Sequence, residues 1–154
     1  MDNQVQTKTE TVKVIRKGIS TLTLSRRFKN AIKNNAELIM VGHIAIPAIT
    51  GDNTPATLSY KITTELLRNE LGYENLIITD GLNMGALMNN YSESDIYVKS
   101  VQAGADLLLL PSNPALAMES IKANIPESRI DESVYRILEF KYNKLSNYTL
   151  LDTS

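Results

Sequence analysis

The sequence contains no cysteine, no tryptophan and a single histidine, His43. Without cysteine, the chain cannot form disulfide scaffolds, thiolate nucleophiles or cysteine-ligated metal sites. One histidine is too few for a histidine-rich zinc site, and a Ser-His-Asp hydrolase would have to use that one residue. We therefore expect neither a metal nor another cofactor.

The sequence also lacks an excess of charge of either sign. Sixteen Lys and Arg residues against 17 Asp and Glu residues give a formal net charge of -1, which offers no global attraction for nucleic acid or an anionic membrane. No window is apolar for long enough to cross a bilayer, and the N-terminal residues lack the apolar stretch of a signal peptide. We expect a small or neutral partner, no nucleic acid or membrane partner, and a cytoplasmic location by default.

At 154 residues, the chain is long enough for one domain with a substantial core. Residues 1–25 are polar and weakly periodic and are expected to form an arm, followed by a domain at 26–146 and a tail at 147–154. Within the domain, the periodicity of apolar residues predicts alternating helices and strands. We expect helices at 26–36, 60–70, 92–104, 115–122 and 128–145, and strands within 37–47, at 76–79 and at 105–110.

Residues that start or stop helices support these boundaries. Ser59, Ser92 and Asp131 are expected to cap the starts of three helices, because their side chains can accept a hydrogen bond from a free backbone amide. The expected stops are Asn34, Asn35, Gly72 and Gly104. In the last helix, Val134, Ile137, Leu138 and Lys141 are spaced as one face.

The alternating order predicts an α/β fold with a parallel sheet, since a parallel neighbour is reached only through a long crossover. The apolar run at 38–47 is typical of a strand buried on both faces. Three strands leave an open doubly wound sheet and part of a (β/α) barrel as alternatives. Both folds place functional groups at the carboxyl ends of the strands.

The strand at 76–79 runs directly into Asp80 and Gly81. At the tip of a buried parallel strand, a carboxylate is partly desolvated yet within reach of a pocket, which suits it for catalysis. The alternative interpretation is that Asp80 caps a helix beginning near Leu82. Position alone does not separate the two.

Several motifs, in order, resemble one family. ELIMVGHIAIPAITGDNTPATLS, then LIITDGLNMGAL, VQAGADLLLLP and IPESRIDESVYRILEFK resemble the C-terminal part of the catalytic barrel of family 3 glycoside hydrolases, over about residues 26–145. The Gly-Leu-Asn-Met that follows Asp80 is similar to the β-N-acetylhexosaminidase branch, whereas the β-glucosidase branch usually has tryptophan there. The resemblance implies a partial (β/α) TIM-type barrel with about three to four parallel strands and flanking helices.

The resemblance also implies roles for individual residues. It makes Asp80 the nucleophile of a retaining glycosidase, and it directs Met40 and His43 into the sugar subsite, with Met84 lining the acetamido side. The alternatives without a functional role are that His43 is a core histidine whose ring nitrogens are hydrogen-bonded within the protein, and that Met84 fills the core.

Three other parts of the chain are expected to be structural. Asp106 is expected at the end of the strands opposite the pocket. The loop at 53–59 is expected to have no catalytic role, and Arg129 is expected on the solvated face of the last helix.

Parts of the family pattern are missing from the sequence. The Lys-His-Phe-Pro-Gly-His-Gly motif and the Asp-Ser-His loop, which supply sugar-binding groups and the acid/base pair in this branch, do not occur. A full barrel needs about 250 residues, so this chain supplies only its last strands. We expect exposed barrel edges, with self-association or a complementing chain as their consequence.

Two functions follow from these observations. The first is the nucleophile half of a hexosaminidase site that hydrolyses terminal β-linked N-acetylglucosamine when complete. The second is a non-catalytic relic or a carbohydrate-binding or interaction domain. A phosphate-binding flavodoxin-like domain is disfavoured, because Gly51, Gly81 and Gly85 do not have the spacing of a glycine-rich phosphate loop.

Overall fold

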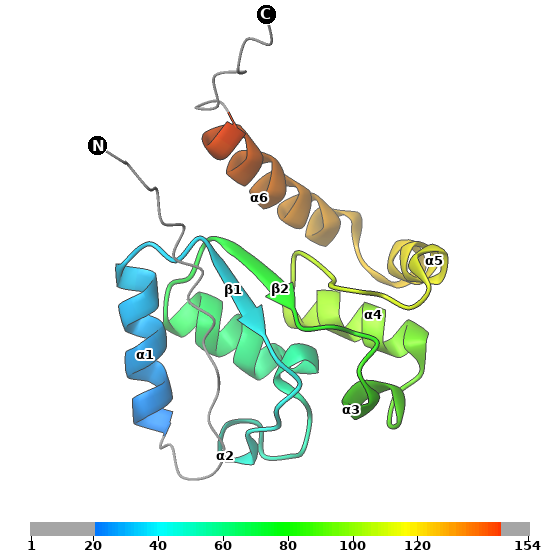
Figure 1. Cartoon of the computed structure of the whole chain (residues 1–154), viewed down its shortest axis with the longest axis horizontal. Helices are drawn as coiled ribbons and strands as arrows, with labels where there is room; N and C mark the ends of the chain where they lie inside the picture. The colour runs from blue at the N-terminus through cyan, green and yellow to red at the C-terminus, as the bar shows by residue number, and fades with distance from the viewer. Residues whose placement is uncertain (1–20, 146–154) are drawn as a thin grey trace, which may run out of the picture.

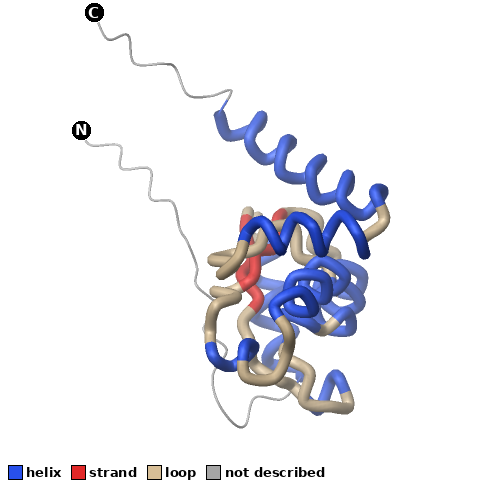
Figure 2. Tube along the Cα trace, turned by 90° about the vertical axis from the view of Figure 1, so that its right-hand side faces the viewer, coloured by secondary structure: helices blue, strands red, loops and turns tan. Residues whose placement is uncertain are grey.

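The computed structural model describes residues 21–145 of the chain, with side chains for 26–144. Most of the predicted arm at 1–25 and the whole predicted tail at 147–154 lie outside these residues. Most of the described chain is helical, with two short strands between the helices (Figures 1 and 2). The elements are α1 (Thr21–Lys33), β1 (Leu38–Val41), α2 (Pro47–Thr50), η1 (Ala56–Leu58), η2 (Lys61–Glu70), β2 (Leu76–Thr79), α3 (Gly85–Met88), α4 (Glu93–Ala103), α5 (Pro114–Asn124) and α6 (Glu127–Leu145).

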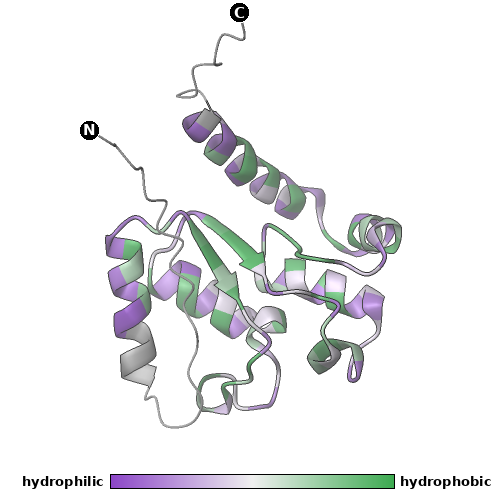
Figure 3. Ribbon diagram, viewed as in Figure 1, coloured by the Kyte–Doolittle hydropathy of each residue, from purple (hydrophilic) through white to green (hydrophobic). Residues whose placement is uncertain are grey.

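The two strands form a parallel sheet, as the alternating order predicts. Leu38 pairs with Leu76 and Val41 with Thr79, so the carboxyl ends of both strands lie at the same edge. Helix η2 lies between the two strands in the sequence and so provides the crossover that a parallel pair requires. Both strands are strongly apolar (Figure 3).

The predicted third strand at 105–110 is wrong as a regular strand. The segment does run beside β2, where the Ile77 carbonyl accepts from the Leu107 amide and the Thr79 amide donates to the Leu107 carbonyl, but only one parallel bridge forms. Beyond it, the Leu109 amide donates to the Thr79 hydroxyl rather than to a backbone carbonyl. Leu110 then has a φ of 48°, which turns the chain out of the extended conformation.

Burial of β1 on both faces was also a wrong prediction. Ile39 and Val41 are buried in a core with Ile77, but Leu38 and Met40 on the opposite face are 42% and 44% exposed. In a strand, successive side chains point to opposite faces, and the described residues cover only one of these faces. Among the residues that the structure describes, β1 is also an edge strand, with β2 as its one neighbour in the sheet.

The predicted helix stops are confirmed by the backbone. Asn35, Gly72 and Gly104 all have positive φ values of 56°, 70° and 120°, and each follows a helix directly or within two residues. This left-handed geometry ends a helix by turning the chain away from its axis. The cap of α4 is confirmed as well, because the Ser92 hydroxyl accepts from the Asp95 amide at 3.2 Å.

Several helix starts differ from the prediction. Helix α1 begins at Thr21 rather than at residue 26. At the start of η2 there is no side-chain cap, and Ser59 instead accepts the amides of Ile62 and Thr63 through its carbonyl. Helix α6 begins at Glu127, so Asp131 lies inside the helix and does not cap it.

The predicted apolar face of α6 is largely exposed. Val134 and Leu138 are 45% and 59% exposed, so they do not join a core within the described residues. The helix is attached instead through polar groups at the amino ends of the strands, where Ser133 and Arg136 bind Asp106. Figure 1 shows α6 beyond these ends, away from the edge where the strands finish.

Candidate functional site

The carboxyl ends of β1 and β2 bring the predicted site residues to one edge of the sheet. His43 follows β1 by two residues and Asp80 follows β2 directly. The Asp80 amide donates to the Val41 carbonyl at 2.9 Å, so the parallel pairing extends to the residue that carries the carboxylate. Helices α2 and α3 lie at this edge, opposite α6 (Figure 1).

The Asp80 carboxylate is partly buried and does not cap a helix. Its Oδ1 accepts the amide of the next residue, Gly81, at 2.7 Å. The following helix, α3, begins only at Gly85, and Met84 before it makes no side-chain cap. Oδ2 receives no hydrogen bond from the described residues. The capping interpretation is therefore wrong, and one oxygen of Asp80 is left available.

His43 is held by protein groups on both sides of its ring. Nε2 lies 2.8 Å from the Gly81 carbonyl oxygen, and Nδ1 lies 2.8 Å from the Thr57 hydroxyl. Thr57 belongs to η1 and is buried, and its hydroxyl also lies within hydrogen-bonding distance of the Val41 and Gly42 carbonyls. Both ring nitrogens are thus used inside the protein, so a sugar in contact with His43 would meet ring carbons.

The two methionines at this edge are exposed. Met40, on the uncovered face of β1, is 44% exposed, and Met84 is 46% exposed, so Met84 does not fill the core. Met84 and Leu110 both lie close to Gly81, because a Cβ placed on that glycine would be 3.8 Å from Met84 Cγ and 3.7 Å from Leu110 Cδ1. Apolar side chains therefore line the position next to Asp80.

Sequence reasoning missed Thr57 and Leu110 as parts of this edge. Thr57 was included only in a structural loop, and its partners lie at least 14 residues away in sequence. Leu110 was assigned to a strand. Neither residue could be predicted as part of the site without knowing which strand ends lie side by side in the fold.

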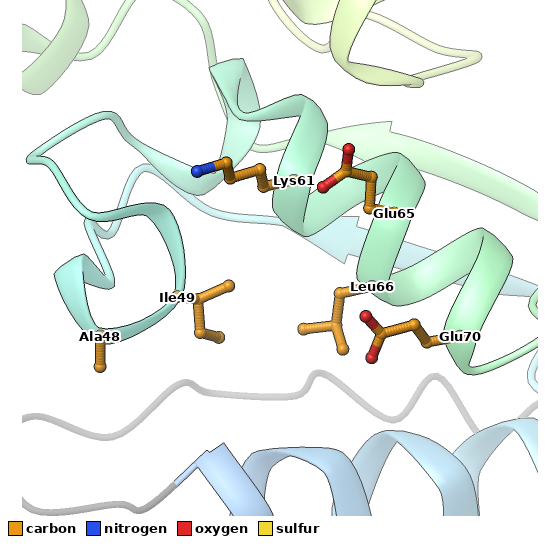
Figure 4. A pocket seen from close by; sticks show the side chains of 6 residues that line it. All are labelled: Ala48, Ile49, Lys61, Glu65, Leu66 and Glu70. Atoms are coloured by element: carbon orange, nitrogen blue, oxygen red, sulfur yellow. The ribbon is translucent and has the colours of Figure 1, made fainter.

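One cavity among the described residues lies between α2 and η2, where Ala48, Ile49, Lys61, Glu65, Leu66 and Glu70 line it (Figure 4). Its lining does not include Asp80. The part of the chain that the structure describes also shows no cluster of three His, Cys, Asp or Glu side chains that could hold a metal ion. No described helix is long and apolar enough to span a membrane.

A second polar cluster lies at the opposite, amino end of the strands. The Asp106 carboxylate is fully buried and binds Arg68 at 2.6 Å and Arg136 at 3.1 Å, with Ser133 and the Ile77 amide as further donors. These contacts tie β2, η2 and α6 together. We find Asp106 to be a structural residue, in agreement with the expectation.

Arg129 belongs to this Asp106 cluster rather than to the solvated helix face predicted for it. It donates to the Ala105 carbonyl at 2.9 Å and to the Ser133 hydroxyl, and it lies 3.9 Å from Asp106. Burial lowers the pKa values of Arg68 and Arg129, and the Asp106 charge opposes that effect. The Asp106 charge thus offsets part of the cost of burying these cations.

Comparisons with known proteins show which family the chain belongs to. Residues 3–140 match the glycosyl hydrolase family 3 N-terminal domain, a region that extends into the predicted arm. The chain is 36% identical over 84 residues to a β-hexosaminidase A of Pseudoalteromonas piscicida, covering 48% of this chain and 14% of that protein. It is 28% identical over 128 residues to a β-N-acetylglucosaminidase/β-glucosidase of Cellulomonas fimi, covering 74% and 23%.

A solved structure supports the same assignment. The family 3 β-N-acetylglucosaminidase of Paenibacillus sp. str. FPU-7 superposes with a TM-score of 0.75 and 33% identity, covering 82% of this chain and 26% of that one. The described residues therefore form part of a TIM-type barrel. The chain belongs to glycoside hydrolase family 3. It spans about a quarter or less of the length of these relatives.

Proposed function

We propose that this chain provides the nucleophile half of a retaining β-N-acetylhexosaminidase site, with Asp80 as the nucleophile. The observation that carries the proposal is the placement of Asp80, partly buried at the carboxyl end of β2 and without a helix to cap. In (β/α) barrels, catalytic groups lie at these ends. The names of the relatives, β-hexosaminidase and β-N-acetylglucosaminidase, support the choice of substrate class.

The proposed reaction has two displacement steps. In the first, an Asp80 oxygen attacks C1 of a terminal β-linked N-acetylglucosamine, the bond from C1 to the aglycone oxygen breaks, and a general acid protonates the leaving oxygen. In the second, water attacks C1, gives up a proton to the same acid/base group and releases Asp80. Two inversions give overall retention of the β configuration.

Three other residues are proposed to surround the sugar. Met40 and Met84 present exposed apolar surface beside the strand ends, suited to the apolar face of a pyranose or the methyl of an acetamido group. His43 lies in the loop after β1 and contacts Gly81, the residue next to Asp80, so its ring carbons can contact the substrate. These sugar contacts are predictions.

The acid/base group and the remaining sugar-binding groups must come from elsewhere. The motifs that supply them in this branch of the family do not occur in the sequence. Loss of general acid assistance alone reduces catalysis by roughly 10²–10⁴-fold. We therefore expect the 154-residue chain by itself to show little or no turnover.

We propose that further β/α units of the same family complete the barrel against β1. Within residues 21–145, β1 has an unpaired edge, and Leu38 and Met40 on its uncovered face are 42% and 44% exposed. Parallel strands added at this edge would satisfy its free backbone groups and cover the apolar side chains. Association of two copies of this chain through the same edge is the competing outcome, and light scattering of the chain with and without such units separates the two.

A mechanism-based fluoro-sugar of the N-acetylglucosaminide type tests the proposed function. The full chain is incubated with the probe, with and without a polypeptide carrying the preceding β/α units, and the mass of the chain is measured. We expect one added glycosyl group when the units are present, and none in the Asp80→Asn variant. Asp95→Asn changes an exposed carboxylate in α4 and is the matched control, expected to label like the unmodified chain.

The second candidate is a non-catalytic carbohydrate-binding or interaction domain of this family. The missing acid/base motif favours it, because binding does not need that group. Two results together would support this second function. The unmodified chain and its Asp80→Asn variant would bind N-acetylglucosamine oligomers equally well, and the unmodified chain would never be labelled, even with added β/α units.

A further inference from the structure

Gly81, the residue that follows Asp80, is held through both of its backbone polar groups. The Gly81 amide donates to Asp80 Oδ1 at 2.7 Å, and the Gly81 carbonyl oxygen lies 2.8 Å from His43 Nε2. The ring is held in turn by the Thr57 hydroxyl at Nδ1. One chain of contacts therefore runs from the end of β1 through Thr57 and His43 to the residue that binds the Asp80 carboxylate.

The proton positions in this chain are restricted by the chemistry of the partners. A carbonyl oxygen can only accept, so His43 Nε2 must carry a hydrogen to bind Gly81. The single Thr57 hydroxyl hydrogen goes either to a backbone carbonyl, that of Gly42 at 2.8 Å or that of Val41 at 3.1 Å, or to Nδ1 of His43. In the first case the imidazole is a cation, and in the second it is neutral, but Nε2 donates to Gly81 in both.

We infer that His43, oriented by Thr57, is a positioning residue for the proposed nucleophile. It fixes the carbonyl of Gly81, the residue whose amide occupies Asp80 Oδ1, and this leaves Oδ2 as the oxygen that attacks the sugar. The inference rests on the proposed function of Asp80. His43 would then have two roles. Its ring nitrogens bind groups of the protein, while its ring carbons remain available to a substrate.

The local structure supports a role in positioning rather than in general packing. Thr57 is 1% exposed and has three possible hydrogen-bond partners, all of them at or just beyond the end of β1. His43 is only partly buried, so its packing contribution is limited. Both polar atoms of its ring are nevertheless used, and one of them acts on the residue next to Asp80.

Nuclear magnetic resonance of the isotopically labelled full chain tests the inference without requiring activity. The ¹⁵N shifts of the His43 ring show which nitrogens carry hydrogen, and we expect Nε2 to be protonated. Hydrogen exchange of the Gly81 amide reports its bond to Asp80. We expect this exchange to become about tenfold faster in Thr57→Val and in His43→Leu, which has no donor, and to stay within about twofold in Thr57→Ser, which keeps the hydroxyl.

The Ile77 amide serves as an internal reference, because it donates to Asp106 at the other end of β2. Unchanged Gly81 exchange in Thr57→Val and His43→Leu, with Ile77 also unchanged, overturns the inference. Faster exchange at both amides means that a variant is unfolding, and the inference is then tested on the His43 ring of the unmodified chain. A hydrogen on Nδ1 and none on Nε2 also overturns the inference. If the Gly81 amide exchanges slowly but the fluoro-sugar never adds a glycosyl group to Asp80, the proposed function is refuted while the positioning of Gly81 stands.

Discussion

Replacing Asp106 by asparagine should destabilise the fold more than any other conservative change to a carboxylate in the described residues. The Asp106 side chain is 0% exposed, and Oδ2 accepts from Arg68 and the Ile77 amide while Oδ1 accepts from Ser133 and Arg136. Asparagine has the same shape, so no cavity forms. Its NH₂ group would nevertheless face donors in either orientation, and the nearby arginines would lose their counter-charge.

The magnitude follows from the burial of these groups. Breaking a fully buried ion pair by removing one partner costs about 3–5 kcal/mol. The side chains of Arg68, Arg129 and Arg136 are 11%, 19% and 23% exposed, so water screens part of the uncompensated charge. We therefore expect a loss of about 3 kcal/mol in the free energy of unfolding, at the lower end of that range. For a domain of this size, the midpoint of thermal unfolding should fall by roughly 6–12 °C.

Urea denaturation followed by circular dichroism measures this loss in the full chain. Asp131→Asn is the matched control, because Asp131 is an exposed carboxylate in α6, and its replacement should change stability by less than about 0.5 kcal/mol. If Asp106→Asn costs no more than this control, the buried carboxylate does not hold η2, β2 and α6 together, and the reasoning is refuted.

Three further stability predictions concern buried positions. Gly104→Ala should destabilise by about 2 kcal/mol or more, because a Cβ at a φ of 120° would lie 2.5 Å from Thr64 Oγ1, and a fall in the urea midpoint tests this. Ser100→Ala should leave thermal stability unchanged or raise it by about 1 kcal/mol, since the buried Ser100 hydroxyl has no hydrogen-bond partner among residues 21–145, and a clear loss would contradict it. Burial raises the pKa of Tyr73 above its ordinary value, so the stability it contributes is complete below a pH of about 10 and is lost as the pH rises further. Tyr73→Phe loses the hydrogen bond to the Leu76 carbonyl, which lowers the free energy of unfolding by about 1 kcal/mol at pH 8. Between pH 8 and pH 11, this variant should lose less stability than the unmodified chain in the same urea titration.

Local signals predicted those elements whose boundaries are set by adjacent residues. Strand β2 matches the predicted range because four apolar or β-branched residues are bounded by Asn75 and Asp80. The ends of η2 and α4 were predictable for the same reason, since a glycine with positive φ stops each helix within a short distance. Such signals need no knowledge of the rest of the fold.

Features that depend on distant neighbours were not predictable in this way. The apolar run in β1 says nothing about whether both faces are covered, and Leu38 and Met40 proved exposed. The segment after Ala105 fails as a strand because a Thr79 side chain replaces a backbone acceptor. Periodicity along one segment cannot reveal a partner from another.

In the candidate site, too, features set by adjacent residues were predictable and features that depend on distant residues were not. Asp80 could be found from the sequence, because a carboxylate at the end of a buried strand breaks a local pattern. The contacts of His43 join residues 14 and 38 positions apart, so no spacing signals them. Arg129 likewise looked like a solvated helical residue, although it reaches a carbonyl in the segment beside β2.

The central claim is that the Asp80 carboxylate forms a covalent bond with C1 of a sugar. Its most direct test is fragmentation mass spectrometry of the peptide spanning β2 and Asp80, after the chain with added β/α units has reacted with the fluoro-sugar and been digested at low pH. We expect a glycosyl ester on Asp80 and on no other carboxylate. A glycosyl group on another residue, with Asp80 unmodified, would contradict it.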